Sequence, residues 1–76
     1  MRMTDIQFRI QCKAAEIAEE TWRRDHYLNR RAELTKRKAP AEIIRRYDMD
    51  LVDVIHRLDL LNLELGDLKD LQLEPV

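Results

Sequence analysis

Hydrophobic residues in the second half of the chain recur at alternating steps of three and four residues. This spacing keeps one side of an α-helix apolar along its length and suits coiled-coil packing against another helix. It predicts an all-α protein whose second helix runs from Pro40 to about Leu65. We call the eight residues that follow the spacing the seam: Ile44, Tyr47, Leu51, Val54, Leu58, Leu61, Leu65 and Leu68.

The first half of the chain predicts another long helix, over about residues 5–38. Thr4 is placed to cap its N-terminus, Gln7 stands three residues later as a capping box requires, and Asp5 suits the positive end of the helix dipole. We expect its inward face to be formed by the apolar and small residues at helical spacing: Ile6, Ile10, Ala14, Ile17, Ala18, Thr21 and Leu28.

Two breakers set the remaining boundaries. Pro40 lacks an amide hydrogen and disfavours helical geometry at Ala39, so a turn is predicted at residues 38–40. Gly66 is expected to end the second helix, with Asp67 capping a short C-terminal turn over residues 67–72. The simplest arrangement is a single-domain antiparallel αα-hairpin over residues 1–76, and the alternative is one long kinked rod.

A second set of apolar residues lies off the seam: Met49, Val52, Ile55, Leu60 and Leu63. A single neighbouring helix leaves these residues exposed to water, and a chain of 76 residues is small for a lone hydrophobic core. We therefore expect two hairpins to associate by two-fold symmetry into a homodimeric four-helix bundle. The parallel or antiparallel sense of that dimer is left open by the sequence.

The composition excludes several classes of protein. Cys12 is the single cysteine, so an internal disulfide and a cysteine-based zinc site are excluded, and the reducing cytoplasm is the expected compartment. We expect Cys12 to be a small buried hydrophobic residue. No apolar stretch has the roughly 20 residues needed to cross a bilayer, and catalytic signatures are absent, so neither membrane insertion, nor a cofactor, nor a metal is predicted.

Charge is segregated along the chain although the net charge is only −1. Residues 21–46 carry nine basic and three acidic side chains, whereas residues 47–76 carry two basic and eight acidic ones. A basic turn flanked by aromatic residues is typical of phosphate and base binding, which makes a nucleic-acid-binding regulator one hypothesis. The other hypothesis is that the segregated charges guide dimer assembly. Two copies of the second helix crossing near His56 would place Arg45 and Arg46 beside Asp67 and Asp70.

Acidic residues also form pairs at helical spacing. Glu16-Ile-Ala-Glu19 and Asp50-Leu-Val-Asp53 each place two carboxylates on one helix face. This arrangement resembles the E-x-x-E and E-x-x-D helices of the all-α nucleotide pyrophosphohydrolases of the MazG type, with Asp50 at a position where that family has Glu. The resemblance implies a magnesium-dependent pyrophosphohydrolase or an inactive relative as a further alternative.

Aromatic and small residues form a strip on the first helix, which we call the aromatic strip: Phe8, Cys12, Ala15 and Trp22. Such a strip either completes the bundle core or binds an amphipathic helix of another protein. We favour a non-enzymatic interaction module that acts on a larger partner protein as an adaptor, chaperone or inhibitor. The predicted partner-binding residues are Phe8, Trp22, Arg23, Arg24, Tyr27, Arg30 and Arg31.

Overall fold

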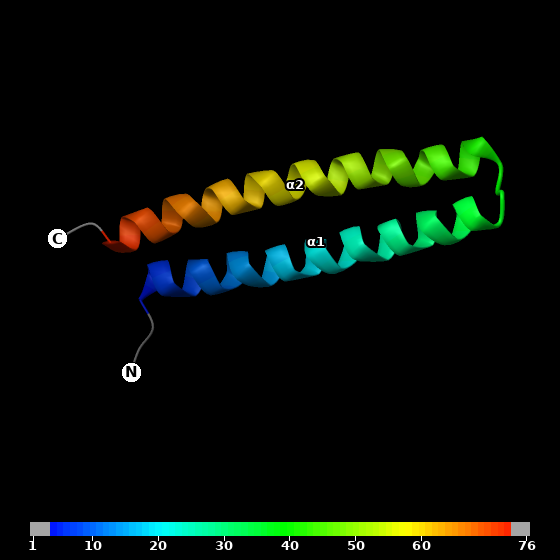
Figure 1. The fold of residues 1–76 in the computed structure, drawn as a ribbon. Helices are drawn as coiled ribbons and strands as arrows, with labels where there is room; N and C mark the ends of the chain where they lie inside the picture. The colour runs from blue at the N-terminus through cyan, green and yellow to red at the C-terminus, as the bar shows by residue number, and fades with distance from the viewer. Residues whose placement is uncertain (1–3, 74–76) are drawn as a thin grey trace.

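The computed structural model of the chain describes residues 4–73, which form two long helices, α1 (Asp5–Lys36) and α2 (Ala41–Leu73). The helices run antiparallel and lie side by side, so the start of α1 and the end of α2 are at the same end of the hairpin (Figure 1). The predicted all-α helical hairpin is confirmed, and the kinked rod is excluded. The predicted domain 1–76 also covers residues 1–3 and 74–76, which lie outside the described residues.

The start of α1 is the predicted capping box. The Gln7 amide donates to Thr4 Oγ1 at 3.1 Å, and the Thr4 amide donates to Gln7 Oε1 at 3.1 Å. Two amides that have no partner within the helix are therefore satisfied by side chains. This reciprocal pair fixes the first turn of α1 and confirms the predicted N-terminus.

The connection between the helices is a tight turn in which a lysine takes the place usually held by glycine. α1 ends at Lys36, and Lys38 has a φ of 55°, in the left-handed region. The Lys38 amide donates to the Thr35 carbonyl at 3.2 Å, and the Ala39 amide donates to the Leu34 carbonyl at 3.0 Å. This is the Schellman hydrogen-bond pattern, so α1 is terminated by its backbone geometry before Pro40 is reached.

The predicted end of the second helix is wrong. α2 continues through Gly66 to Leu73, and the predicted separate turn at residues 67–72 is part of it. Gly66 does not have a positive φ and therefore takes an ordinary helical conformation. Glycine inside a helix costs only about 1 kcal/mol relative to alanine, and the seam continues past it to Leu68, so packing against α1 outweighs the local preference.

The seam of α2 faces α1 along its whole length. All eight of its residues are buried or half-buried. Leu51, Val54 and Leu58 are 6%, 3% and 6% exposed, and they are the buried hydrophobic residues of the part of the chain that the structure describes. The core is therefore one layer of side chains between two helices, and its centre lies at the middle of α2.

The inward face of α1 differs from the prediction. Ala14, Ala18 and Leu28 are exposed, and the side that meets α2 instead follows the same alternation of four and three residues as the seam. Charged residues occupy four of its nine positions, and their long side chains bury their stems while the charged ends reach partners. The positions are Ile6, Ile10, Lys13, Ile17, Glu20, Arg24, Tyr27, Arg31 and Leu34.

Three ion pairs join these charged positions to residues that flank the seam. Lys13 pairs with Glu64, Glu20 pairs with Arg57 at 3.1 Å, and Arg31 pairs with Asp48. The residue number falls on α2 as it rises on α1, as an antiparallel pair requires. A shift of one helix by a turn would break all three pairs together, so they fix the register of the hairpin more than they add to its stability.

The second apolar set remains exposed in the hairpin. Met49, Val52, Ile55, Leu60 and Leu63 all lie on surfaces that α1 does not cover. The radius of gyration is 17.3 Å, whereas a compact domain of this length has about 11 Å. The chain is an extended two-helix ribbon with an unusually large apolar surface, and its assembly into a four-helix bundle stays a prediction.

Candidate protein-interaction site

The aromatic strip lies on the side of α1 away from α2 and is exposed. Phe8 is 59% exposed and Trp22 is 68% exposed, although aromatic side chains of this size are usually buried. Ala15 is exposed as well, and Cys12, which the sequence predicts to be buried, is exposed. The strip therefore does not complete the core of the hairpin.

Trp22 is held in place by the residue one turn later on α1. The His26 ring stacks on the Trp22 indole with the centroids 5.4 Å apart and 7° between the planes. The spacing of four residues between Trp22 and His26 is the sequence signal for this contact. The imidazole therefore lies against one face of the indole, and the rest of the indole stays exposed.

Tyr27 lies between the helices instead of on the exposed site. It is half-buried, and its ring meets the ring of Tyr47 on α2 in an edge-on arrangement with the centroids 6.0 Å apart. Arg31 is half-buried too and pairs with Asp48 of α2. Both residues are predicted to bind a partner, and in the structure both connect the two helices of the hairpin.

The other predicted arginines have carboxylate neighbours on their own helix. Arg23 donates to Glu20 at 3.0 Å, Arg24 to Asp25 at 3.2 Å, and Arg30 to Glu33 at 3.1 Å. Each guanidinium carries five N–H donors, so these contacts leave donors free for a second acceptor. Arg23 and Arg30 stand three residues before and four residues after His26 on α1. Arg23 bonds Glu20 of the packed face, and interaction with the Tyr47 hydroxyl of α2, together with Glu33, raises the pKa of Arg30.

The turn carries the strongest positive charge of the described residues. Its five cationic residues are exposed to solvent and form no ion pair within residues 4–73. They come from the end of α1, the connection and the start of α2, so the fold gathers them at one tip of the ribbon (Figure 1). We call them the basic turn: Lys36, Arg37, Lys38, Arg45 and Arg46.

The acidic pairs of the MazG-type resemblance do not form a metal site in the structure. Within the described residues, no three His, Cys, Asp or Glu side chains come close enough to hold a metal ion together. Glu16 pairs with Lys13 at 3.7 Å, and Asp50 and Asp53 line a separate surface hollow with Arg46 and Met49. The two carboxylate pairs therefore act as separate surface features.

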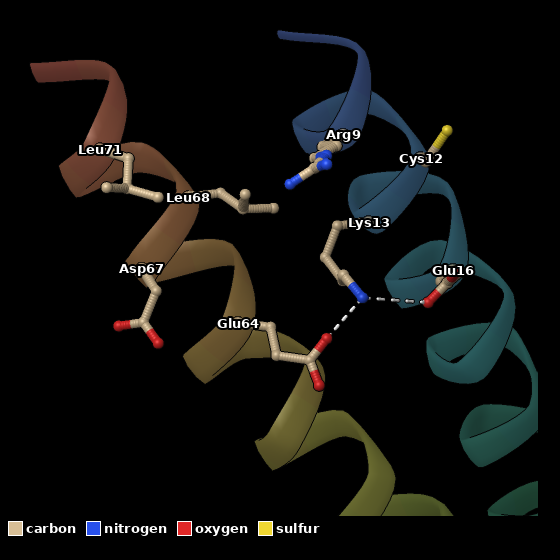
Figure 2. Close-up of a pocket in the computed structure, with 8 residues that line it drawn as sticks. All are labelled: Arg9, Cys12, Lys13, Glu16, Glu64, Asp67, Leu68 and Leu71. Atoms are coloured by element: carbon tan, nitrogen blue, oxygen red, sulfur yellow. Dashed lines mark hydrogen bonds and ion pairs between the residues drawn. The ribbon is translucent and has the colours of Figure 1, made fainter. Parts of the chain in front are cut away.

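The open end of the hairpin contains a shallow groove of about 400 Å³ between the start of α1 and the end of α2. Figure 2 shows Leu68 reaching toward α1 across the groove, while the Cys12 thiol points away from α2. The Lys13 ammonium crosses the groove to Glu64, and this hydrogen bond raises the pKa of Lys13 above its ordinary value of 10.5, with Glu16 adding to the effect. The groove is thus closed on one side by an ion pair that belongs to the hairpin itself.

Comparison with known proteins gives no further assignment. No protein-family model matches the chain, and no characterised protein or solved structure shows significant similarity to it. Within the described residues, neither helix is long and apolar enough to cross a membrane.

Proposed function

We propose that the hairpin is a non-enzymatic protein-interaction module, a homodimer that acts on a larger partner protein as an adaptor, chaperone or inhibitor. The observation that carries this proposal is the exposure of Trp22 and Phe8 on the outer side of α1. Tryptophan and arginine are the residues most often found at the energetic centres of protein interfaces. An exposed indole is unfavourable in water and well suited to a protein partner, and arginines near it can pair with acidic groups of that partner.

The site indicates what kind of surface it would bind. The Trp22 indole, with the His26 ring stacked on one face, offers an exposed aromatic anchor, and Arg23 and Arg30 on the same stretch of α1 add positive charge. A complementary partner has an apolar pocket or helix face for the indole and acidic side chains next to it. Phe8 lies four helical turns before Trp22, about 21 Å away along α1, so the partner surface is elongated.

The proposal is tested by capture from the lysate of the native host with two matched variants. Trp22→Ala removes the centre of the site, whereas Leu28→Ala removes an apolar side chain that is also exposed on α1 but lies off the strip. Truncating an interface tryptophan costs about 2 kcal/mol or more, which weakens binding roughly 30-fold. We expect a protein that is retained by the wild type and by Leu28→Ala to be lost from Trp22→Ala.

The same experiment has a direct spectroscopic form, because Trp22 is the single tryptophan of the chain. Its emission should shift to shorter wavelength when the captured protein is added and covers the indole. Equal retention by both variants, or emission that stays unchanged on binding, contradicts the proposal.

Nucleic-acid binding is the second candidate, and the basic turn is the observation that favours it. Its five cations are gathered at one tip without ion-pair partners in the described residues. Salt distinguishes the two functions, since binding to phosphates weakens steeply between low and moderate ionic strength, whereas an apolar protein interface loses little. Replacing Lys36, Arg37 and Lys38 together by alanine should abolish retention of an oligonucleotide and leave protein capture unchanged.

A further inference from the structure

The side of α2 opposite the seam carries a second row of apolar residues. We call it the outward face: Met49, Val52, His56, Leu60 and Leu63. Its four apolar side chains are 48–67% exposed. At about 100° per residue these positions lie half a helical turn from the seam, so α1 cannot reach them. α2 is therefore apolar on two opposite sides, and the hairpin covers only one of them.

The apolar residues of the outward face are spaced symmetrically on either side of His56. Val52 and Leu60 lie four residues on either side of His56, and Met49 and Leu63 lie seven residues on either side. Steps of four and seven residues return to the same helix face. Two copies of α2 that run antiparallel and cross at His56 thus place Val52 of each copy against Leu60 of the other, and Met49 against Leu63.

The charges beyond the apolar row follow the same symmetry with opposite signs. Arg45 stands eleven residues before His56, and Asp67 stands eleven residues after it. Residues 40–46 carry two basic and one acidic side chain, and residues 66–72, which stand opposite them across an axis at His56, carry two acidic and one basic. An antiparallel pair brings these segments together as opposites, while a parallel pair would bring like charges together.

This order of charges works against α2 taken alone. A helix dipole favours acidic residues near the N-terminus and basic residues near the C-terminus. α2 has Glu42 in its first turn, as the dipole favours, but Arg45 and Arg46 follow in its second turn and its last turn has no basic residue. The basic second turn and the missing basic last turn give the isolated helix no advantage, and an antiparallel second copy would compensate these charges.

The exposed area is large enough for such a contact. The hairpin exposes 6546 Å², about 1,600 Å² more than the roughly 4,900 Å² of a compact monomer of 9.2 kDa. A standard protein interface takes about 800 Å² from each partner. A second copy can therefore cover the outward face, and the hairpin has surface to spare for it.

We propose that a second copy of the chain covers the outward face of α2, antiparallel and with its two-fold axis at His56. Because the outward face lies opposite the seam, the four helices of the predicted dimer form one layer in the order α1, α2, α2, α1. The two aromatic strips then lie on opposite edges of the layer. This inference deepens the proposed function and rests on its homodimer, and it makes the module bivalent for its partner.

Cysteine cross-linking tests the position of the axis. In a Cys12→Ser background, His56→Cys places two thiols on the axis, whereas Ala18→Cys places them on the outer side of α1. Under mild oxidation we expect a covalent dimer from His56→Cys with helicity retained, and none from Ala18→Cys. Equal cross-linking of the two variants, or none from His56→Cys, overturns the proposal.

A charge exchange tests the antiparallel sense without a cysteine. Arg45→Asp and Asp67→Arg each bring two like-charge contacts into the dimer and should weaken it about tenfold. The double variant restores both pairs and should return the dissociation constant to within about threefold of the wild-type value. If the effects of the single changes simply add in the double variant, the antiparallel arrangement is wrong.

Both assays are carried out without a partner protein, which separates this inference from the proposed function. If Trp22→Ala loses partner capture and His56→Cys does not cross-link, the interaction module is supported and the proposed dimer is rejected. If His56→Cys cross-links and Trp22→Ala does not affect capture, the dimer is supported and the proposed interaction site is rejected.

Discussion

Glu20 gives the sharpest test of how the two helices are held together, because it is a charged residue in the middle of the packed side of α1. It is 9% exposed and accepts hydrogen bonds from Arg23 at 3.0 Å and from Arg57 at 3.1 Å. We expect Glu20→Leu to increase the free energy of unfolding. Leucine at this position extends the apolar packing and leaves both arginines free to be solvated.

The magnitude follows from the exposure of the partners. Burying a leucine side chain contributes about 1.5–3 kcal/mol. The side chains of Arg57 and Arg23 are 51% and 43% exposed, so solvent screens the lost ion pairs and each contributes about 1 kcal/mol at most. The net expectation is a gain of roughly 1 kcal/mol, in line with the general result that apolar residues can replace buried ion pairs.

The opposite change in the same network should have the opposite sign. Replacing both Arg23 and Arg57 by alanine leaves the Glu20 carboxylate buried without a donor, which costs about 1–3 kcal/mol. Glu33→Leu is the matched control, because Glu33 is an exposed acid on α1 that pairs with Arg30. This control should change stability by less than about 0.5 kcal/mol.

The assay is urea unfolding followed by circular dichroism at several protein concentrations, so that the contribution of dimerisation is separated from that of the hairpin. A loss of stability in Glu20→Leu, or an unchanged midpoint in the double arginine variant, would refute the reasoning. The first result would mean that the ion pairs of Glu20 supply net stability, and the second that the buried carboxylate does not need its arginine donors.

Further predictions concern local structure and are checked by the same unfolding measurement. Gly66→Ala should stabilise the chain by about 0.5–1 kcal/mol, because Gly66 is helical and an added Cβ would meet nothing within 4 Å. Lys38→Gly should stabilise it by roughly 1 kcal/mol, since Lys38 has a φ of 55°. Thr4→Ala should cost about 1 kcal/mol through loss of the capping box. The raised pKa of Lys13 contributes stability below its ordinary value of 10.5 that is lost as the pH rises above it, and Glu64→Gln should reduce this alkaline dependence to the part that Glu16 supplies.

The fold could be predicted wherever apolar periodicity and local chemistry agree. The seam from Ile44 to Leu68 and the capping box at Thr4 are strong signals, and both lie where the sequence places them. The end of α2 could not be found from Gly66, because the helix-ending preference of glycine is weaker than the packing of the seam around it.

The inward face of α1 could not be identified from apolar spacing, because charged residues occupy several of its positions. Lys13, Glu20 and Arg31 occupy packed positions because each has an oppositely charged partner on α2, and a search for apolar spacing alone passes over them. For the same reason, two of the predicted partner-binding residues lie between the helices instead of on the exposed site. Arg31 and Tyr27 look like surface residues in the sequence, whereas only the packed pair of helices shows that they face Asp48 and Tyr47.

The central claim is that α2 is covered on both sides while the aromatic strip of α1 stays exposed. The most direct test is sedimentation equilibrium of the unmodified chain, with Trp22 emission recorded over the same concentrations. The account predicts a particle of twice 9.2 kDa that dissociates on dilution, with the emission of an exposed indole throughout. A mass of 9.2 kDa at every concentration, or emission that shifts as the particle dissociates, would contradict it.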